Sequence, residues 1–441
     1  MRKILAVTVL AILAVLDPRS AANATSTVDM LAGVSGAAQG ARADLVTASG
    51  ASGIERIPLV GNVAHYRFDV RVGAGEHDVI RMHRIVRERA PWIPETGHRG
   101  VFLVPGDGWG FEANFLAGTT APEIPDDRNL AVFLAEGEID VWGLDFRWTL
   151  VPGDVTDLSF MADWGLGTGL ADLDLALAVA RSVRALTGSG LDPVHLVGFS
   201  RGGQLGWAQA AAETQRPAVL RHVSGLVSIE NAWKPDDEAV RQSDCASYAS
   251  LEGQLAAGVY ASDYRIVADI GDLATTAPED PSPFLPSLSN ADLAEWLGAS
   301  VGGGAIPHFH SVGGLVDPAT LVTELLYTEP ASWFAYLSGS AAYHPLRVSL
   351  DGAAIGCDEL DSPFDDHFEE VAIPVLYVGV AGAYGELGIH ATTLIASPDV
   401  STLIVRRAAT PDEDWGHIDP FLADAAREEI WQPILSWIEA H

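Results

Sequence analysis

Short apolar runs alternate with stretches of helical spacing through the first half of the chain. The runs have the length and composition of buried strands, and they predict strands over 65–72, 78–86, 100–105, 139–144, 194–197 and 222–229. Apolar residues three and four positions apart predict helices over 128–135, 168–186 and 204–213. Because strand and helix alternate after an initial antiparallel pair, we expect an α/β fold with a mostly parallel sheet covered by helices.

This alternation stops near residue 230 and returns at residue 373. Residues 231–370 are irregular and rich in proline, serine, aspartate and aromatic residues, with short helical pieces expected over 290–297 and 319–327. Strands are expected again over 373–378 and 402–405, followed by a helix over 420–440. The pattern therefore predicts two core segments, 61–230 and 371–441, that a large cap interrupts, since an insertion this long usually has a function.

The turn between the strand at 194–197 and the helix that follows carries the sequence Gly198-Phe-Ser-Arg-Gly202. This is the G-x-S-x-G pattern of a nucleophile elbow, in which a strained turn exposes the serine hydroxyl at the edge of a sheet. The two glycines remove side chains that would collide in such a turn. The alternative is an ordinary tight turn with a capping serine. We expect Ser200 to be a nucleophile.

A nucleophilic serine needs backbone N–H groups that stabilise the oxyanion formed during the reaction. One should belong to Arg201, the residue after the nucleophile, and the helix that begins there adds the positive end of its dipole. The other should come from the glycine-rich loop after the strand at 100–105, from the backbone of Asp107 or of Gly108. The glycines of this loop could also serve only to form a turn.

The base is expected in the stretch Asp414-Trp-Gly-His-Ile-Asp419, between the last strand and the last helix. Histidine titrates near neutral pH, so it can accept the proton of the serine hydroxyl. His417 follows the nucleophile in the order that hydrolases of this type use. His390 is a competitor, but it lies where a surface helix should start.

These features together resemble the α/β-hydrolase superfamily, and most closely its lipase and esterase branches. The likeness extends from Tyr66 to Ile438. Residues 78–85 are similar to the early strand of acid-lipase-like members, residues 129–142 to their helix and strand ending in Asp-Val-Trp, and residues 416–419 to their Gly-His-x-Asp stretch. The resemblance implies the α/β-hydrolase fold with a large cap, and a serine hydrolase that cleaves esters.

The chain departs from the family pattern at two places. Pro105-Gly106 stands where a His-Gly pair is usual, and no aspartate follows the strand at 373–378, where the triad acid commonly lies. Glu230 directly ends the strand at 222–229, a placement that some members of the superfamily use, and Glu386 lies late in the loop after 373–378. Both satisfy the order serine, acid, histidine. Glu230 is the preferred acid and Glu386 the alternative.

The cap leaves the sheet right beside the strand that follows the elbow. It must therefore start at the edge where α/β folds bind ligands. We expect it to cover the active site and to set substrate choice, with apolar walls supplied by aromatic residues of the insertion: Trp296, Phe309, Trp333, Phe334 and Tyr336.

Net charge narrows the range of partners. The 441-residue chain has a formal net charge of −33 and only two lysines, Lys3 and Lys234. Phosphate backbones would be repelled, so nucleic acid is excluded as an expected partner. The charge itself indicates no substrate.

The N-terminus has the features of an export signal. Arg2 and Lys3 precede an apolar stretch that is too short to span a bilayer, and small residues follow at 22–24. We expect residues 1–24 to be a signal peptide, residues 25–60 to be a loosely structured segment, and the mature protein to be secreted or periplasmic without a transmembrane segment. Cys245 and Cys357 would then meet oxidising conditions and form a disulfide.

Metal and nucleotide sites are weaker candidates. His308 and His310 with Asp317 could bind a metal, but no further ligand has a recognisable spacing, and polar cap residues are the preferred interpretation. Glycines 302–304 lack the strand and helix of a phosphate-binding loop. No cofactor is expected.

The sequence therefore predicts a secreted serine hydrolase that cleaves a small-molecule or polymeric ester through an acyl-enzyme. Ser200, His417 and Glu230 would form the triad. The alternatives are an acyltransferase or peptidase with the same triad, or a binding protein of this fold without catalytic activity.

Overall fold

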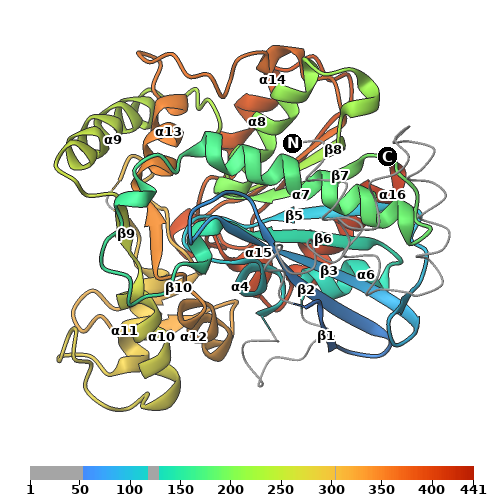
Figure 1. Ribbon diagram of the computed structural model, residues 1–441. Helices are drawn as coiled ribbons and strands as arrows, with labels where there is room; N and C mark the ends of the chain where they lie inside the picture. The colour runs from blue at the N-terminus through green and yellow to red at the C-terminus, as the bar shows by residue number, and fades with distance from the viewer. Residues whose placement is uncertain (1–52, 118–128, 303) are drawn as a thin grey trace.

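The computed structural model describes residues 53–117, 129–302 and 304–441. Within these ranges ten strands form one mixed sheet in the order β1-β2-β3-β6-β5-β7-β8-β13-β14, with β4 paired to β3 (Figure 1). The strands are Glu55–Pro58 (β1), Val63–Arg71 (β2), Val79–Ala90 (β3), Ile93–Pro94 (β4), Gly100–Val104 (β5), Asp140–Asp145 (β6), Val194–Phe199 (β7), Val223–Ile229 (β8), Val375–Val380 (β13) and Val400–Val405 (β14). From β6 to β14 all neighbours are parallel, and β1 to β3 form an antiparallel edge.

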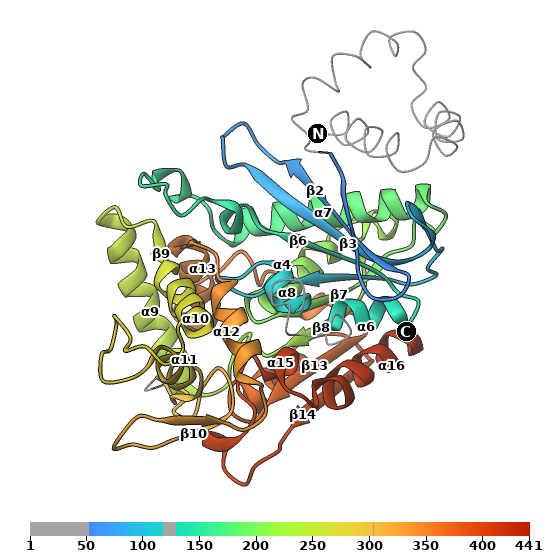
Figure 2. The same ribbon diagram turned by 90° about the horizontal axis from the view of Figure 1, so that it is seen from below.

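Helices cover both faces of this sheet (Figure 2). Helix α6 (Leu130–Glu136) and helix α16 (Gln432–Ala440) pack on one face, and α7 (Leu166–Leu186) and α8 (Arg201–Thr214) on the other. Strands β5, β6, β7 and β13 are buried along their whole length because both of their faces are covered. The predicted fold class, a mostly parallel sheet between helices, is confirmed.

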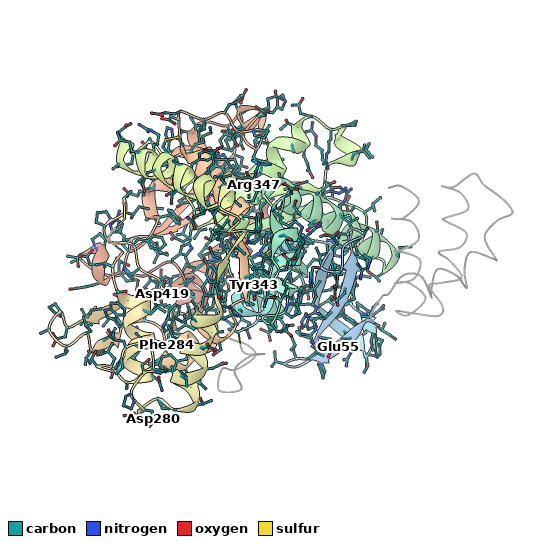
Figure 3. The ribbon with its side chains drawn as sticks, turned by 60° about the vertical axis from the view of Figure 1, so that its left-hand side comes forward. Glu55, Asp280, Phe284, Tyr343, Arg347 and Asp419 are labelled. Carbon is teal, nitrogen blue, oxygen red and sulfur yellow. A yellow bond between two sulfur atoms is a disulfide. The ribbon has the colours of Figure 1, made fainter. Side chains whose placement is uncertain are left out.

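The chain between β8 and β13 gathers at one end of the sheet, on the left in Figures 1 and 2. Figure 3 shows Asp280 and Phe284 of this region well away from Glu55 on the antiparallel edge. Two short sheets, β10-β11 and β9-β12, form within it. Its elements are Glu238–Ala256 (α9), Ala261–Asp263 (β9), Arg265–Thr276 (α10), Asn290–Ala299 (α11), Gly314–Val316 (β10), Thr323–Leu325 (β11), Pro330–Ser338 (α12), Tyr343–Pro345 (β12) and Leu346–Gly356 (α13).

The structure corrects two predictions about helices. Residues 319–327 form no helix; β11 pairs with β10 in a hairpin, because β-branched residues such as Val322 and Thr323 favour extended backbone. The expected helix over 420–440 is broken into α15 (Asp419–Leu422), a π-helical turn over Arg427–Trp431, and α16. Ala423 separates the first two with extended backbone, where it bridges to Thr328 of the cap.

The N-terminal predictions lie mostly outside the described residues. The expected signal peptide, 1–24, is not among them, and neither are residues 25–52 of the expected loose segment. Residues 55–58 of that segment instead form β1, which pairs with β2 from Glu55 opposite Arg67 to Pro58 opposite Ala64. In the described ranges we find no helix with the length and apolar character needed to cross a membrane.

A disulfide joins Cys245 in α9 to Cys357, the residue that ends α13. The Cα atoms are 4.8 Å apart, and 112 residues of sequence separate the two cysteines. Gly356 lies beside Asp244, and a Cβ at Gly356 would be 1.9 Å from the Asp244 Oδ2 atom. The disulfide therefore connects the first helix of the cap to its last, where the two pack closely.

Removing this disulfide should lower the free energy of unfolding by about 2–5 kcal/mol, because an open loop of this length gains conformational entropy in the unfolded chain. The measurement is urea unfolding of the double variant Cys245→Ser/Cys357→Ser against the wild type. Mass spectrometry of the non-reduced protein after alkylation is the control: two alkylated cysteines would show that the bond is not formed.

Candidate active site

Ser200 lies on a strained turn between β7 and α8, with φ 53° and ψ −119°. The flanking glycines permit this conformation. A Cβ at Gly198 would lie 2.2 Å from the carbonyl oxygen of Gly202, and a Cβ at Gly202 would lie 2.2 Å from that of Val104. The Ser200 N–H donates to the Ile229 carbonyl at 2.9 Å, which ties the turn to the end of β8. The turn has the backbone geometry that the G-x-S-x-G pattern predicts.

The loop after β5 passes directly beside this serine. A Cβ at Gly106 would lie only 3.1 Å from the Cβ of Ser200. Among the residues that the structure describes, the N–H groups of Arg201, Asp107 and Gly108 have no hydrogen-bond partner. All three expected oxyanion donors are therefore available next to the expected nucleophile, and Asp107 and Gly108 remain alternatives for the second one.

His417 lies in the loop between β14 and α15, next to the elbow. Its N–H donates to the His310 carbonyl at 2.9 Å, so a segment of the cap fixes its backbone. Its ring centroid is 4.7 Å from that of Phe199, the residue before Ser200. The rings of Phe309 and Tyr384 lie at 5.3 and 5.5 Å. The imidazole is thus held in an aromatic cage beside the expected nucleophile.

Glu230 directly follows β8 and is fully buried. Its backbone has φ 51°, a conformation rare for a residue with a side chain, and its Oε2 lies 3.1 Å from the Nδ1 of His417. Glu386 is exposed instead and pairs with Arg406 at 2.8 Å. The structure therefore brings Glu230, and not Glu386, to the histidine.

The last residue of β13 and the loop after it donate hydrogen bonds to this buried carboxylate. The N–H groups of Val380 and Gly385 point to Oε1 at 2.7 and 3.3 Å, and that of Tyr384 points to Oε2 at 3.2 Å. Because these donors reach both oxygens, they fix the orientation of the Glu230 side chain toward His417. The loop after β13, where the triad acid commonly lies, here supplies backbone hydrogen-bond donors to Glu230.

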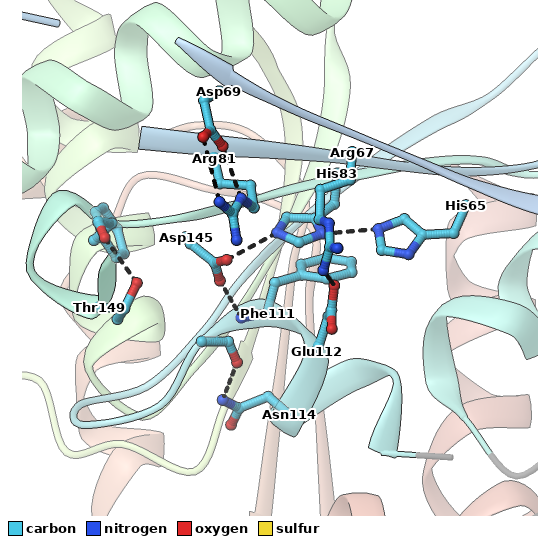
Figure 4. A network of polar contacts seen from close by, with 12 residues as sticks. His65, Arg67, Asp69, Arg81, His83, Phe111, Glu112, Asn114, Asp145 and Thr149 are labelled. Atoms are coloured by element: carbon cyan, nitrogen blue, oxygen red, sulfur yellow. Dashed lines mark hydrogen bonds and ion pairs between the residues drawn. The ribbon is translucent and has the colours of Figure 1, made fainter. Parts of the chain in front are cut away.

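Two buried histidines and an aspartate hold the far end of the oxyanion loop (Figure 4). The Asp145 carboxylate accepts the Phe111 N–H at 2.6 Å, at the start of α4 (Phe111–Phe115), and contacts His83 Nε2 at 3.1 Å. The other ring nitrogen of His83 lies 2.9 Å from His65 Nε2. Since Asp145 can only accept, His83 donates to it and accepts from His65. Burial lowers the pKa of His65 well below its usual value, in keeping with a neutral imidazole.

Comparison with solved structures identifies the fold. A structure from Sulfolobus solfataricus described as a candidate lipase superposes with a TM-score of 0.61 over 88% of this chain and 99% of that one, at 18% sequence identity. This chain has the α/β-hydrolase fold. A soluble variant of a monoglyceride lipase from Saccharomyces cerevisiae aligns with 89% of this chain over 97% of its own length. The sequence identity is 13% and the TM-score is 0.45. No protein-family model and no curated protein sequence matches the chain.

Two carboxylates that the sequence analysis left without a role fix the histidine loop of this α/β-hydrolase fold. Asp414 accepts hydrogen bonds from the N–H groups of Arg407, Ala408 and Trp415. Asp419 accepts from Gly416 at 2.7 Å and, in the cap, from the Gly313 N–H and the Thr328 hydroxyl. Both residues flank His417 in the sequence. Only their burial, which the sequence does not show, distinguishes them from surface aspartates.

Burial raises the pKa of Asp419 to about 6, and its hydrogen bonds only partly oppose this shift. A carboxyl whose pKa is raised on folding contributes its stabilisation at low pH and loses it as the pH rises through that value. We therefore expect the Tm of the wild type to fall between pH 4 and pH 7 more than that of Asp419→Asn, because asparagine keeps the shape without ionising. Equal slopes of Tm against pH in both proteins would contradict this.

His310, which the sequence analysis considered as a metal ligand, is engaged in other contacts. The ring nitrogens of His310 lie 2.8 and 2.9 Å from the carbonyl oxygens of His308 and Asp414. Among the described residues, two other groups place nitrogen and carboxylate atoms within 4.8 Å of one another: His65, His83 and Glu112, and Asp174, Glu213 and His222. In the first group the histidines bond to each other and Glu112 pairs with Arg67 at 2.8 Å; in the second, Asp174 pairs with Arg216.

Proposed function

We propose that this protein is a serine hydrolase that cleaves carboxylic esters through an acyl-enzyme intermediate. The observation that carries the proposal is the contact between Glu230 and His417 beside the strained turn of Ser200. A serine, a buried carboxylate and a histidine, in this chain order and at one sheet edge, are what nucleophilic acyl transfer on this fold requires. The likeness of the fold to a candidate lipase is consistent with it.

In the proposed reaction the Ser200 Oγ attacks the ester carbonyl while the Nε2 of His417 takes the hydroxyl proton. The Nδ1–H of His417 donates to Glu230, which fixes the tautomer and stabilises the imidazolium. The carbonyl oxygen becomes an oxyanion and accepts hydrogen bonds from the N–H of Arg201 and that of Asp107 or Gly108. His417 then protonates the departing alcohol. Water, with His417 again as base, releases the acid and regenerates Ser200.

A cleft beside the histidine cage can take part of the substrate. It has a volume of about 660 Å³, within the range of ligand sites, and Tyr384 lines it. Because the Tyr384 ring also lies against His417, the cleft adjoins the proposed catalytic centre. Its apolar lining comes from the cap and from the segment after β13: Val240, Ile306, Pro307, Leu387 and Ile389. Charged side chains, among them Asp236, Glu386 and Arg406, line the cleft as well, so we assign it to part of the ester without restricting that part to an apolar chain.

The test is covalent labelling with a fluorophosphonate probe, followed by a panel of p-nitrophenyl esters of rising acyl length. We expect the label on Ser200 and turnover of at least one ester. An unlabelled protein that hydrolyses no ester would instead be a binding protein of this fold. Phe309→Ala, which opens the cage on the cap side, should change the preferred acyl length more than the turnover of the shortest ester.

We also propose that the protein is exported. The Cys245–Cys357 disulfide supports this, since such bonds persist in oxidising compartments. The expected cleavage after residue 24 gives the test. Mass spectrometry of the protein recovered from the medium or periplasm should find a first residue between Asn23 and Ser26. Recovery of the uncleaved chain only inside the cell would contradict export.

A further inference from the structure

The side chains of Arg201 and Asp107 join the two segments that carry the proposed oxyanion donors. The Nε of Arg201 lies 3.2 and 3.0 Å from the two carboxylate oxygens of Asp107, a contact between residues 94 positions apart. We propose that this ion pair, together with His344 of the cap, holds the oxyanion donors at their working distance. These side chains are then positioning residues, and the inference rests on the proposed function.

The cap contacts the same loop from the other side. His344 of β12 is buried, and its Nε2 lies 3.2 Å from the Asp107 Oδ1. The Ala341 N–H donates to the Gly108 carbonyl at 2.7 Å. The Tyr264 ring covers Gly108 so closely that a Cβ there would lie 2.8 Å from it. The donor loop is therefore held between the elbow and a strand pair of the cap, and neither support is local in sequence.

Helix α13 is shaped to accept the arginine. A Cβ at Gly352 would lie 1.6 Å from the Nη1 of Arg201, so any larger residue at this position would displace the guanidinium from where it lies. The same nitrogen also contacts the Gln204 carboxamide oxygen. Because Cys357 ties the end of α13 to α9, the helix that accepts the guanidinium is itself anchored.

Charge favours a structural role for this arginine over recognition of an anionic substrate. Burial alone would raise the pKa of Asp107, but Arg201 and His344 outweigh burial and hold that pKa below its usual value, so the carboxylate stays ionised. The guanidinium is thereby neutralised. An exposed ion pair would contribute little to the stability of the fold. Displacement of an oxyanion donor, in contrast, acts directly on the stabilisation of the transition state.

The first experiment is steady-state kinetics of Arg201→Ala, with Arg216→Ala as the matched control. Arg216 follows the other end of α8 and pairs with Asp174, away from the site. Loss of a whole oxyanion donor costs about 100- to 1,000-fold in kcat, so a displaced donor should cost about 10- to 100-fold while KM changes by less than about threefold. Arg201→Lys should retain more activity than Arg201→Ala, since it keeps the charge without the planar fork. The control should match the wild type.

Coupling between the two side chains gives a second criterion. The double variant Arg201→Ala/Asp107→Ala should lose no more activity than the worse single variant, because both remove one interaction. Two independent losses that multiply would overturn the proposal. So would a kcat of Arg201→Ala within threefold of the wild type, or an effect confined to KM.

Hydrogen exchange separates this inference from the proposed function. The amides of Ala341 and Phe111, which donate to the Gly108 carbonyl and to Asp145 at the two ends of this contact, should exchange faster in Arg201→Ala than in the wild type or in Arg216→Ala, whether or not the protein is an enzyme. If the wild type takes no fluorophosphonate and cleaves no ester, the proposed function fails, and the exchange rates alone decide whether Arg201 holds the loop. Unchanged exchange rates in a folded Arg201→Ala protein would contradict the inference even if the wild type is an active esterase.

Discussion

Replacing Ser200 with alanine should lower kcat for ester hydrolysis about a millionfold, the loss typical of a triad nucleophile. The variant loses one oxygen atom, and the turn at φ 53° is held by Gly198, Gly202 and the bond to Ile229, all of which remain. The fold should therefore survive. The measurement is kcat on the best p-nitrophenyl ester, with circular dichroism and Tm as the check on folding.

Ser182→Ala is the matched control, because within the described part of the chain its hydroxyl bonds only to the Ala178 carbonyl of helix α7. It should retain wild-type turnover and take the fluorophosphonate label normally. A Ser200→Ala protein that keeps a tenth of wild-type turnover would end the proposed mechanism.

The second large effect on kcat is expected from substitution of Glu230, the proposed triad acid. Glu230→Gln should lower kcat about ten-thousandfold, because the neutral amide no longer fixes the tautomer of His417 or stabilises its positive charge. The three backbone N–H groups around the carboxylate make the substitution more severe, since they require acceptors on both oxygens and one position becomes an NH₂. The measurement is kcat on the same ester as for Ser200→Ala.

Glu386→Gln is the comparison for this prediction. Its carboxylate is two-thirds exposed and pairs with Arg406, so the substitution should cost little. If the two variants behaved in the opposite way, Glu386 would be the acid, and the loop after β13 would have to move in solution.

The parts of the site that depend on short stretches of sequence could be predicted. The elbow needs a buried strand, two glycines and a helix in direct succession, and residues 194–214 have this order. Glu230 could be proposed because it ends a buried strand next to the elbow, where a solvated side chain is unexpected. Both inferences rest on residues close in sequence and on the rule that parallel strands end at one edge.

The insertion between two core strands could be recognised and its helix over 290–297 is found as α11, but its other elements could not be predicted. Helix α9 has 19 residues, of which only Val240 is buried, so its sequence shows no apolar stripe. The segment 319–327 has helical apolar spacing, yet pairing with β10 decides its conformation. In both cases contacts with distant parts of the chain, which the sequence does not show, determine the structure.

The pairing of side chains that are distant in sequence could not be predicted either. Arg201 and Asp107 were both expected at the oxyanion site for their backbone N–H groups, and nothing local indicates that their side chains meet. The chain from Asp145 through His83 to His65 joins β2, β3 and β6, which the sequence places in separate runs. Local patterns predict which segments reach the sheet edge, but not which polar groups pair there.

The bond between Ala341 and Gly108 connects the proposed activity to the local stability of the cap. Among the described strands, β12 pairs only with β9, so this buried strand has fewer backbone partners than the inner strands of the ten-stranded sheet. Such a pair can open at temperatures where the ten-stranded sheet is still intact, and it would then release the loop that carries Asp107. If the proposed activity is present, we expect it to fall on warming before the ten-stranded sheet unfolds. The working temperature could accordingly be raised by stiffening β9 and β12, at positions that do not contact substrate.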